Sequence, residues 1–287
     1  MSMTINTNVA SLNAQRNTAT NSASLSTTMQ RLSSGLRINS AKDDAAGLAI
    51  ADRMNTQIRG MNVAVRNAGD AISLAQVAEG GLSAMNDMLQ RMRELAVQAS
   101  NAPNSVGASG DIAKLNNEYV QLGAELNRML SATQFNGENV LNGSADYVFQ
   151  VGANAGVENR ITISSSDISL SGNTDFSAVA SGGSSATLDT AAASNNTANI
   201  GALDLAISAV NDRRASLGAL QSRFENTIAY LRTAGENQSA ARSRIMDADF
   251  AAETANLSRT QILQQAGTAM IAQANQLPQN VLKLLQG

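Results

Sequence analysis

The chain has 287 residues and a net charge of −3, and it contains neither cysteine nor histidine. These absences exclude disulfides, the usual zinc and copper sites, and the commonest general base near neutral pH. The sequence also lacks a basic block for nucleic acid and an apolar run of the ~20 residues that a bilayer requires. We therefore expect no enzyme, no cofactor, no metal, no nucleic-acid partner and no membrane insertion.

Apolar residues make up 43 % of the chain, but aromatic residues make up only 3 %. A compact globule of this length normally uses more aromatic bulk, whereas long, thin helical packing needs less. The first six residues have neither a charged nor an apolar region typical of a signal peptide. The composition therefore favours a helical protein that is either cytoplasmic or exported by a leaderless route.

Residues 4–34 predict an amphipathic helix with a polar, nearly uncharged face. Its apolar stripe begins with Ile5, Val9 and Leu12, at the spacing of a coiled-coil seam. The polar face is rich in asparagine, a mediocre helix former, so the helix is marginal on its own. Gly35 interrupts the pattern.

A second, very long helix is expected after this glycine. Ser40 followed by Asp43 fits a capping box, which places the start of the helix there. The apolar pattern then continues for about 55 residues without a proline, or roughly 80 Å. Helices of this length belong to coiled coils or bundles. Pro103 and its neighbouring glycines predict the turn that follows.

The middle of the chain predicts a shorter helix and a hairpin. A helix beginning near Asp111 is expected to fold back antiparallel on the long helix, and residues 133–137 end it in an Asn-Gly turn. Residues 147–151 and 160–163 flank a Gly-Ala-Asn loop and predict a β-hairpin. Residues 171–197 are rich in serine, glycine and alanine, so we expect a surface-exposed segment and not a domain.

Another helix is expected to begin near Thr197 or Asn199 and to lose its register around residues 243–249. Asp247 or Asp249 can cap the last helix, which Pro278 should bend or interrupt. The apolar seam of this last helix continues to the chain end and includes Leu263, Met270, Leu277, Val281 and Leu284. Two striped ends without a core of their own are expected to pair with each other and with other chains.

The predicted fold is mainly α: a long-helix antiparallel bundle with a small β-hairpin region, plus a terminal coiled coil formed by the N- and C-terminal helices. We expect three parts. The terminal coiled coil comprises residues 1–44 and 243–287. The bundle comprises residues 45–170 and 198–242, and the variable segment is 171–197.

Several long motifs resemble bacterial flagellin, in the same order along the chain. The resemblance covers residues 1–165 and 195–287, and its motifs lie at residues 30–51, 90–98, 133–137, 243–250 and 277–282. It implies a subunit that polymerises with itself into the tubular filament used for swimming. The paired termini would line an inner channel, and the short variable segment would face outward. A hook–filament junction protein shares the terminal architecture and is the alternative.

The resemblance also implies a life cycle and partners. The subunit would be exported unfolded through the flagellar type III apparatus and would work outside the cell, which explains the missing signal peptide. Its terminal helices would fold on assembly. The implied partners are an export chaperone, the filament cap and the hook–filament junction proteins.

Two patches resemble sites that host immune receptors recognise in flagellins. Residues 30–51 resemble the epitope of a plant receptor kinase; within it we single out Arg37, Asn39, Lys42 and Asp43. The positions that resemble contacts of the flagellin-sensing Toll-like receptor of animals are Arg91, Leu95 and Glu118. Without that resemblance, all of these are ordinary turn, cap and helix-face residues.

Overall fold

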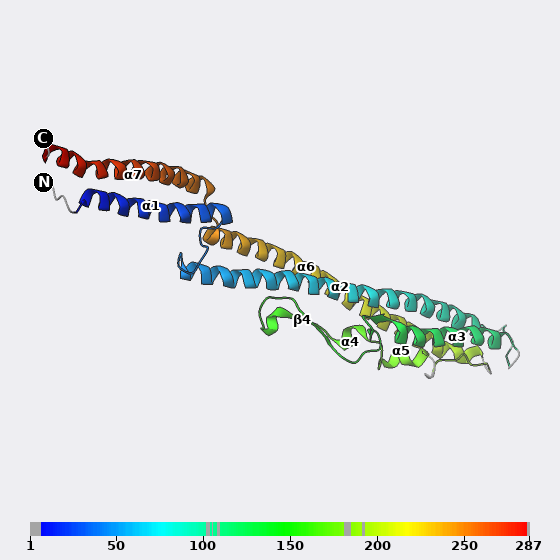
Figure 1. Ribbon diagram of the computed structural model, residues 1–287. Coiled ribbons are helices and arrows are strands. Elements are labelled where there is room, and N and C mark those ends of the chain that lie inside the picture. Colours follow the sequence, from blue (N-terminus) through cyan, green and yellow to red (C-terminus); the bar gives the residue numbers. More distant parts are fainter. Residues whose placement is uncertain are drawn as a thin grey trace. The chain divides into compact units, whose positions relative to one another are not determined.

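A computed structural model describes residues 7–101, 104, 106–107, 110–180, 185–190 and 193–285, without the side chains of residues 193–194 and 277–285 (Figure 1). The chain forms two compact units. We call residues 1–56 with 236–287 the terminal unit, and residues 57–235 the central unit. None of the described helices is long and apolar enough to cross a membrane.

The predicted mainly α architecture is confirmed, with the long helices at the expected places. In chain order, the elements are α1 (Val9–Ser34), α2 (Ala45–Ala99), α3 (Asp111–Ala132), β1 (Gln134–Phe135), β2 (Glu138–Asn139), β3 (Tyr147–Gln150), η1 (Val157–Asn159), β4 (Arg160–Ile163), α4 (Ser165–Ile168), α5 (Thr174–Val179), η2 (Ala193–Asn196), α6 (Thr197–Met246) and α7 (Phe250–Leu285).

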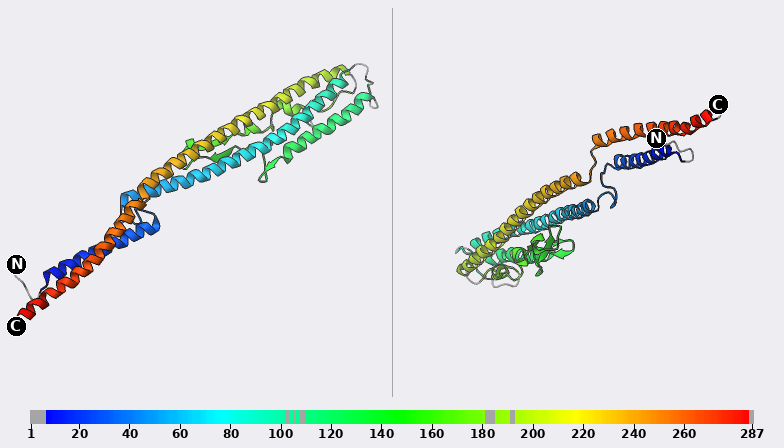
Figure 2. Two further views of the ribbon diagram at one scale, coloured as in Figure 1. Left: turned by 90° about the horizontal axis from the view of Figure 1, so that it is seen from above. Right: turned by 90° about the vertical axis from the view of Figure 1, so that its left-hand side faces the viewer.

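The core of the central unit lies between α2, α3 and α6, which run side by side (Figures 1 and 2). Along α2 the buried face changes from alanine at Ala68, Ala71, Ala75 and Ala78 to larger side chains from Leu82 onward. The buried residues recur every three or four positions, as an amphipathic helix requires. Leu126 of α3 and Phe224 of α6 are fully buried in the same cluster.

The predicted hairpin is confirmed. Strands β3 and β4 pair antiparallel, with Tyr147 opposite Ile163 and Gln150 opposite Arg160. Phe149 of β3 meets Phe224 of α6 edge-to-face, with ring centroids 5.9 Å apart and an interplanar angle of 81°. This aromatic contact, together with buried Ile163, fixes the hairpin on the bundle.

The expectation of a surface-exposed segment over residues 171–197 needs correction. Phe176 and Val179 of α5, and Leu188 beyond it, are buried in the core of the central unit. The hydroxyl of Tyr119 donates to the carbonyl of Ser185 at 2.9 Å, and burial raises the pKa of this phenol. The few large apolar side chains of the segment therefore anchor it. The free energy gained by burying them outweighs the preference of the surrounding serine-rich sequence for solvent.

In the terminal unit, α1 and α7 lie side by side and antiparallel (Figures 1 and 2). The side chain of Asn8 caps α1 by accepting the N–H of Ser11 at 3.1 Å. Gly35 ends this helix in a left-handed conformation, with a φ of 70°. Asp249 caps α7 by accepting the N–H groups of Ala251 and Ala252, and α7 continues through Pro278 to Leu285.

Candidate assembly surface

The seam between α1 and α7 has a heptad spacing but is built mostly from small and polar residues. These seam positions are buried or half-buried: Ser11, Ala14, Thr18, Asn21, Leu25, Thr28 and Leu32 on α1, and Glu253, Leu257, Thr260, Gln264, Gly267, Ile271 and Ala274 on α7. They recur at alternating intervals of three and four residues, the pattern of a coiled coil. The predicted pairing of the two terminal helices is therefore confirmed, although its side chains differ from those expected.

Small residues bring the two helices very close together. A Cβ atom added at Gly267 would lie 2.6 Å from the Oγ1 atom of Thr18, so glycine is required for this approach. The predicted apolar seam was only partly right. On α7, Gly267 and Ala274 do face α1, whereas Leu263 is 43 % exposed and Met270 is 58 % exposed. Large side chains at the point of closest approach would force the helices apart, and the four large apolar seam residues, Leu25, Leu32, Leu257 and Ile271, lie elsewhere along it.

Large hydrophobic side chains are instead displayed on the outside of the terminal unit. On α1, Val9 is 65 % exposed and Leu12 is 52 % exposed. The further exposed large hydrophobic residues of α1 and α7 are Met29, Phe250, Ile262, Leu263 and Met270. Ile5 lies outside the described residues, as do the side chains of Leu277, Val281 and Leu284.

An open groove of ≈ 580 Å³ runs along one side of the helix pair. Leu263 and Met270 contribute apolar surface to it, and α1 contributes small polar side chains such as Asn13, Asn17 and Thr20. Contiguous apolar surface of this kind commonly marks a protein interaction site.

The two helices exchange polar contacts near both ends of the seam. At one end Asn8 donates to the carbonyl of Ala274 at 2.7 Å, and Ser11 donates to the side-chain oxygen of Asn275, also at 2.7 Å. At the other end Arg31 forms an ion pair with Glu253 at 3.5 Å. These contacts were not predicted from the sequence, although the charged Glu253 at a seam position of α7 was a readable signal.

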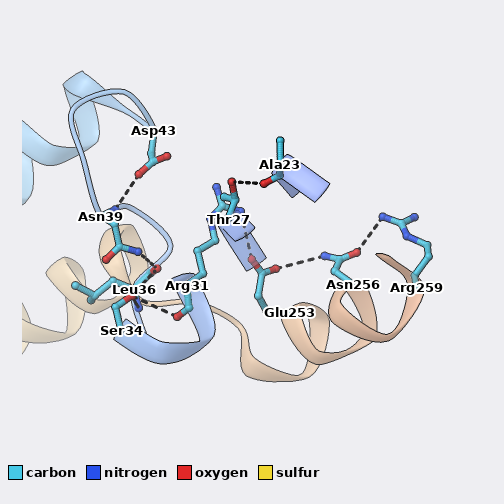
Figure 3. Close-up of polar contacts among 10 residues, drawn as sticks. All are labelled: Ala23, Thr27, Arg31, Ser34, Leu36, Asn39, Asp43, Glu253, Asn256 and Arg259. Atoms are coloured by element: carbon cyan, nitrogen blue, oxygen red, sulfur yellow. Dashed lines mark hydrogen bonds and ion pairs between the residues drawn. The ribbon is translucent and has the colours of Figure 1, made fainter. Parts of the chain in front are cut away.

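The turn between α1 and α2 contains the residues that resemble the plant receptor epitope. Arg37 is exposed and holds the end of α6, because its backbone N–H donates to Met246 at 2.6 Å and its side chain donates to Ile245 at 2.7 Å. Asn39 donates to the carbonyl of Leu36 (Figure 3). Lys42 and Asp43 are also exposed, so the structure brings these four residues together on one turn.

The predicted capping box at this turn is replaced by two successive motifs. Asp43 accepts hydrogen bonds from the backbone of Asn39 and Ser40 and from the Ser40 hydroxyl. The helix itself begins at Ala45, where Asp44 accepts the N–H of Gly47 at 2.8 Å. The correction is that Asp44 is the cap and that Asp43 stabilises the turn before it, because one carboxylate cannot serve both sets of donors.

Asp43 gives this turn a predicted dependence on pH. The N–H of Asn39, then the N–H and hydroxyl of Ser40, lower the pKa of the carboxyl group, because they stabilise its charged form. A carboxyl group whose pKa is lower in the folded state stabilises it above the unfolded-state pKa. That stabilisation is lost as the pH falls through the folded-state pKa.

We expect the carboxyl carbon of Asp43 to titrate at lower pH in the folded chain than in a peptide of residues 37–47, as measured by NMR. The Ser40→Ala variant removes one of the three donors and should bring the two midpoints closer. Equal midpoints for the folded chain and the peptide would contradict the bonding of this turn.

The three positions that resemble Toll-like receptor contacts are not equivalent in the structure. Arg91 of α2 pairs with Glu118 of α3 at 2.8 Å and with Glu94 at 3.0 Å, and these hydrogen bonds raise the pKa of Arg91. The side chains of Arg91 and Glu118 are 50 % and 46 % exposed. Leu95, in contrast, is 1 % exposed and belongs to the core of the central unit.

A bundle of long helices with paired terminal helices defines a helical structural protein. The family model "Bacterial flagellin N-terminal helical region" matches residues 5–146. "Bacterial flagellin C-terminal helical region" matches residues 200–285. The chain belongs to the bacterial flagellin family, whose members are structural subunits of the extracellular flagellar filament and not enzymes.

Full-length relatives agree with this assignment. The flagellin of Halalkalibacterium halodurans is 46 % identical over 285 residues, which cover 99 % of this chain and 100 % of the relative. The flagellin of Bacillus subtilis is 41 % identical over 305 aligned positions, with the same coverage. The crystal structure of Bacillus cereus flagellin aligns with a TM-score of 0.47 at 27 % identity, covering 62 % of this chain and 94 % of that one.

Proposed function

We propose that the exposed hydrophobic residues of α1 and α7 are the contacts through which one subunit binds the next in the filament. The observation that carries this proposal is that Val9, Leu12, Leu263 and Met270 are all more than 40 % exposed on helices whose mutual seam is small and polar. Soluble chains do not usually display so many large apolar side chains on one pair of helices without a partner.

Assembly through these residues would also explain how the terminal unit becomes stable. The α1–α7 seam contains few large apolar side chains, so pairing alone buries little hydrophobic surface. Burial against neighbouring subunits adds about 25 cal/mol for each Å² of apolar surface. Folding of the terminal helices is then coupled to polymerisation, as for other segments that order on binding.

The remaining roles follow from family membership. We propose that residues 1–44 and 243–287 form the inner domain, that residues 45–170 and 198–242 form the surrounding bundle, and that the chain is exported unfolded through the flagellar type III apparatus. An export chaperone, the filament cap and the hook–filament junction proteins are the partners proposed for these steps. A hook–filament junction protein, which shares the terminal architecture, remains the alternative proposal.

Recognition by host receptors is a separate proposal. For the animal receptor, the proposed contacts are Arg91, Leu95 and Glu118. For the plant receptor, they lie on the turn that carries Arg37, Asn39, Lys42 and Asp43. All of these side chains except Leu95 are exposed or half-exposed in the folded chain, which supports their availability to a partner.

The assembly proposal is tested by placing a charge on the exposed face. Purified monomer is added to short filament seeds, and elongation is followed by electron microscopy and by pelleting. We expect Leu263→Asp and Met270→Asp each to slow elongation at least tenfold, because a carboxylate buried without a partner is strongly unfavourable. The matched control is Gln265→Asp, which carries the same new charge at an exposed position about 160° around α7 from Leu263.

Three results distinguish the explanations. Loss of elongation with Leu263→Asp and Met270→Asp, but not with Gln265→Asp, supports the proposed contact surface. Equal loss with all three variants would indicate a nonspecific effect of charge and would count against it. Wild-type elongation in the first two variants would show that assembly uses another surface.

A further inference from the structure

We propose that the ion pair between Arg31 and Glu253 sets the register in which α1 and α7 pair, and so acts as a register lock of the assembled subunit. This inference rests on the proposed function, because the register matters only if the paired helices build the filament. Arg31 and Glu253 are positioning residues in this role, since they act by placing the exposed hydrophobic residues.

The seam itself provides little information about register. Two of its hydroxyl groups bond within their own helices: Thr18 donates to the carbonyl of Ala14 at 2.9 Å, and Thr260 donates to that of Asn256, also at 2.9 Å. Only a few large side chains interlock, so most of the seam tolerates a shift of one heptad at little cost. The polar contacts near the two ends of the seam must therefore select one pairing, and the ion pair of Arg31 with Glu253 is the charged contact among them.

The sequences of the two helices single out the ion pair for this task. Glu253 is the only acidic residue in α1 and α7 together, and Arg16 and Arg31 are the only basic residues of α1. Glu253 is 8 % exposed although it carries a charge. A buried charge needs a partner, and in the observed register Arg31 provides it at 3.5 Å.

Figure 3 shows how the carboxylate of Glu253 is satisfied. One oxygen accepts from Arg31 across the seam. The other accepts from the side chain of Asn256 at 3.3 Å, and Asn256 in turn accepts from Arg259 at 3.0 Å. Within the terminal unit this chain of contacts leaves Glu253 with a single cationic partner on α1.

A shift of one heptad removes that partner. If α7 moved so that Glu253 faced residue 24, the carboxylate would lie beside Ser24, Leu25 and Thr28, and no cation of α1 would be within reach. Arg16 would come close only after a shift of about two heptads, which would abandon much of the seam. The ion pair therefore penalises the nearest alternative registers, a known use of buried polar groups in coiled coils.

The test combines charge exchange with crosslinking in the full chain, which has no cysteine of its own. In each variant, Ser11→Cys with Asn275→Cys reports the observed register through a short bis-maleimide bridge. Ser11→Cys with Thr268→Cys reports the register shifted by one heptad. Intramolecular bridges are separated from intermolecular ones by mass, and elongation from seeds is measured on the same proteins without the cysteines.

We expect Arg31→Glu and Glu253→Arg each to slow elongation at least tenfold and to reduce the bridge of the observed register. The double exchange Arg31→Glu with Glu253→Arg should restore elongation to within about threefold of wild type, which a purely steric role would not do. Arg16→Glu makes the same charge change at an exposed position of α1 and should stay within about twofold.

Other outcomes overturn the register lock. It is wrong if Arg31→Glu elongates normally with the bridge of the observed register, or if the double exchange is as defective as the single variants. The bridges are measured in pelleted filaments, because the terminal helices are proposed to pair on assembly. If the wild-type chain fails to elongate from intact seeds, the proposed function fails. If the wild-type chain elongates and the Arg31→Glu chain does so equally well with the bridge of the observed register, the register lock alone fails.

Discussion

A chain that ends at residue 262 is expected to build no filament, while its central unit unfolds at the same temperature as in the full chain. The deletion removes the second half of the α1–α7 seam, including Gly267 and Ala274. It also removes the contacts of Ala274 and Asn275 with the start of α1. Leu263 and Met270, the proposed subunit contacts, are lost with them.

The stability of the central unit should not change when residues 263–287 are removed. Its hydrophobic core extends from Ala68 to Phe224 and contains no residue of α1 or α7. Stability changes at sites that share no contacts are usually independent, so the unfolding temperature of this core should change by no more than about 2 °C.

Two measurements on the truncated chain test this expectation: elongation from seeds, and thermal unfolding followed by near-ultraviolet circular dichroism of the buried tyrosine. The control is a full-length chain with Gln265→Asp, which should elongate normally. Normal filaments from the truncated chain would show that the terminal helices are not required. A large fall in unfolding temperature would show that the central unit depends on them.

Sequence periodicity predicted the helices well, because their patterns are long and end at clear signals. Gly35 ends α1, Asp249 caps α7, and the Asn-Gly pair at residues 136–137 forms the expected turn. The β3–β4 hairpin was equally readable from its two short runs of β-branched and aromatic residues. Local chemistry fixes each of these features, so a single sequence is sufficient to find them.

Features that depend on tertiary contacts were predicted less well. The apolar stripes predicted for α1 and α7 contained residues that do face the seam, such as Gly267 and Ala274, but also Leu263 and Met270, which the close approach at Gly267 and Thr18 leaves facing outward. The segment around Phe176 was expected at the surface because its composition is polar, yet a few of its apolar side chains are buried in the core and anchor it there. Composition averages over a segment, whereas packing is decided by individual residues.

Leu95 is buried although it matches a receptor-contact position of flagellins. Leu95→Ala is expected to destabilise the central unit by about 2–5 kcal/mol, because it removes a fully buried side chain and leaves a cavity. For a domain of this size, that corresponds to a fall in unfolding temperature of roughly 5–15 °C. Arg91→Ala removes an exposed ion pair and should cost no more than about 1 kcal/mol.

The effects on receptor signalling should also differ between the Arg91→Ala and Leu95→Ala variants. If the ion pair of Arg91 and Glu118 is the proposed receptor contact, Arg91→Ala should raise the monomer concentration needed for half-maximal signalling roughly tenfold, as for a central interface arginine. The matched control is Arg93→Ala, which also removes an exposed ion pair, that with Asp204 at 2.6 Å. It should leave signalling unchanged, because Arg93 is not among the positions that resemble receptor contacts.

The burial of Leu95 predicts how receptor signalling by the Leu95→Ala variant should depend on its folding. A side chain that is 1 % exposed cannot touch a receptor unless the helix first moves, so any loss of signalling should follow the unfolded fraction of the variant. Signalling is therefore measured well below the unfolding temperature of Leu95→Ala, where nearly all of it is folded. Normal signalling there would assign Leu95 to the core alone. Reduced signalling under conditions where the variant is fully folded would mean that the receptor opens the α2–α3 surface and contacts Leu95 directly.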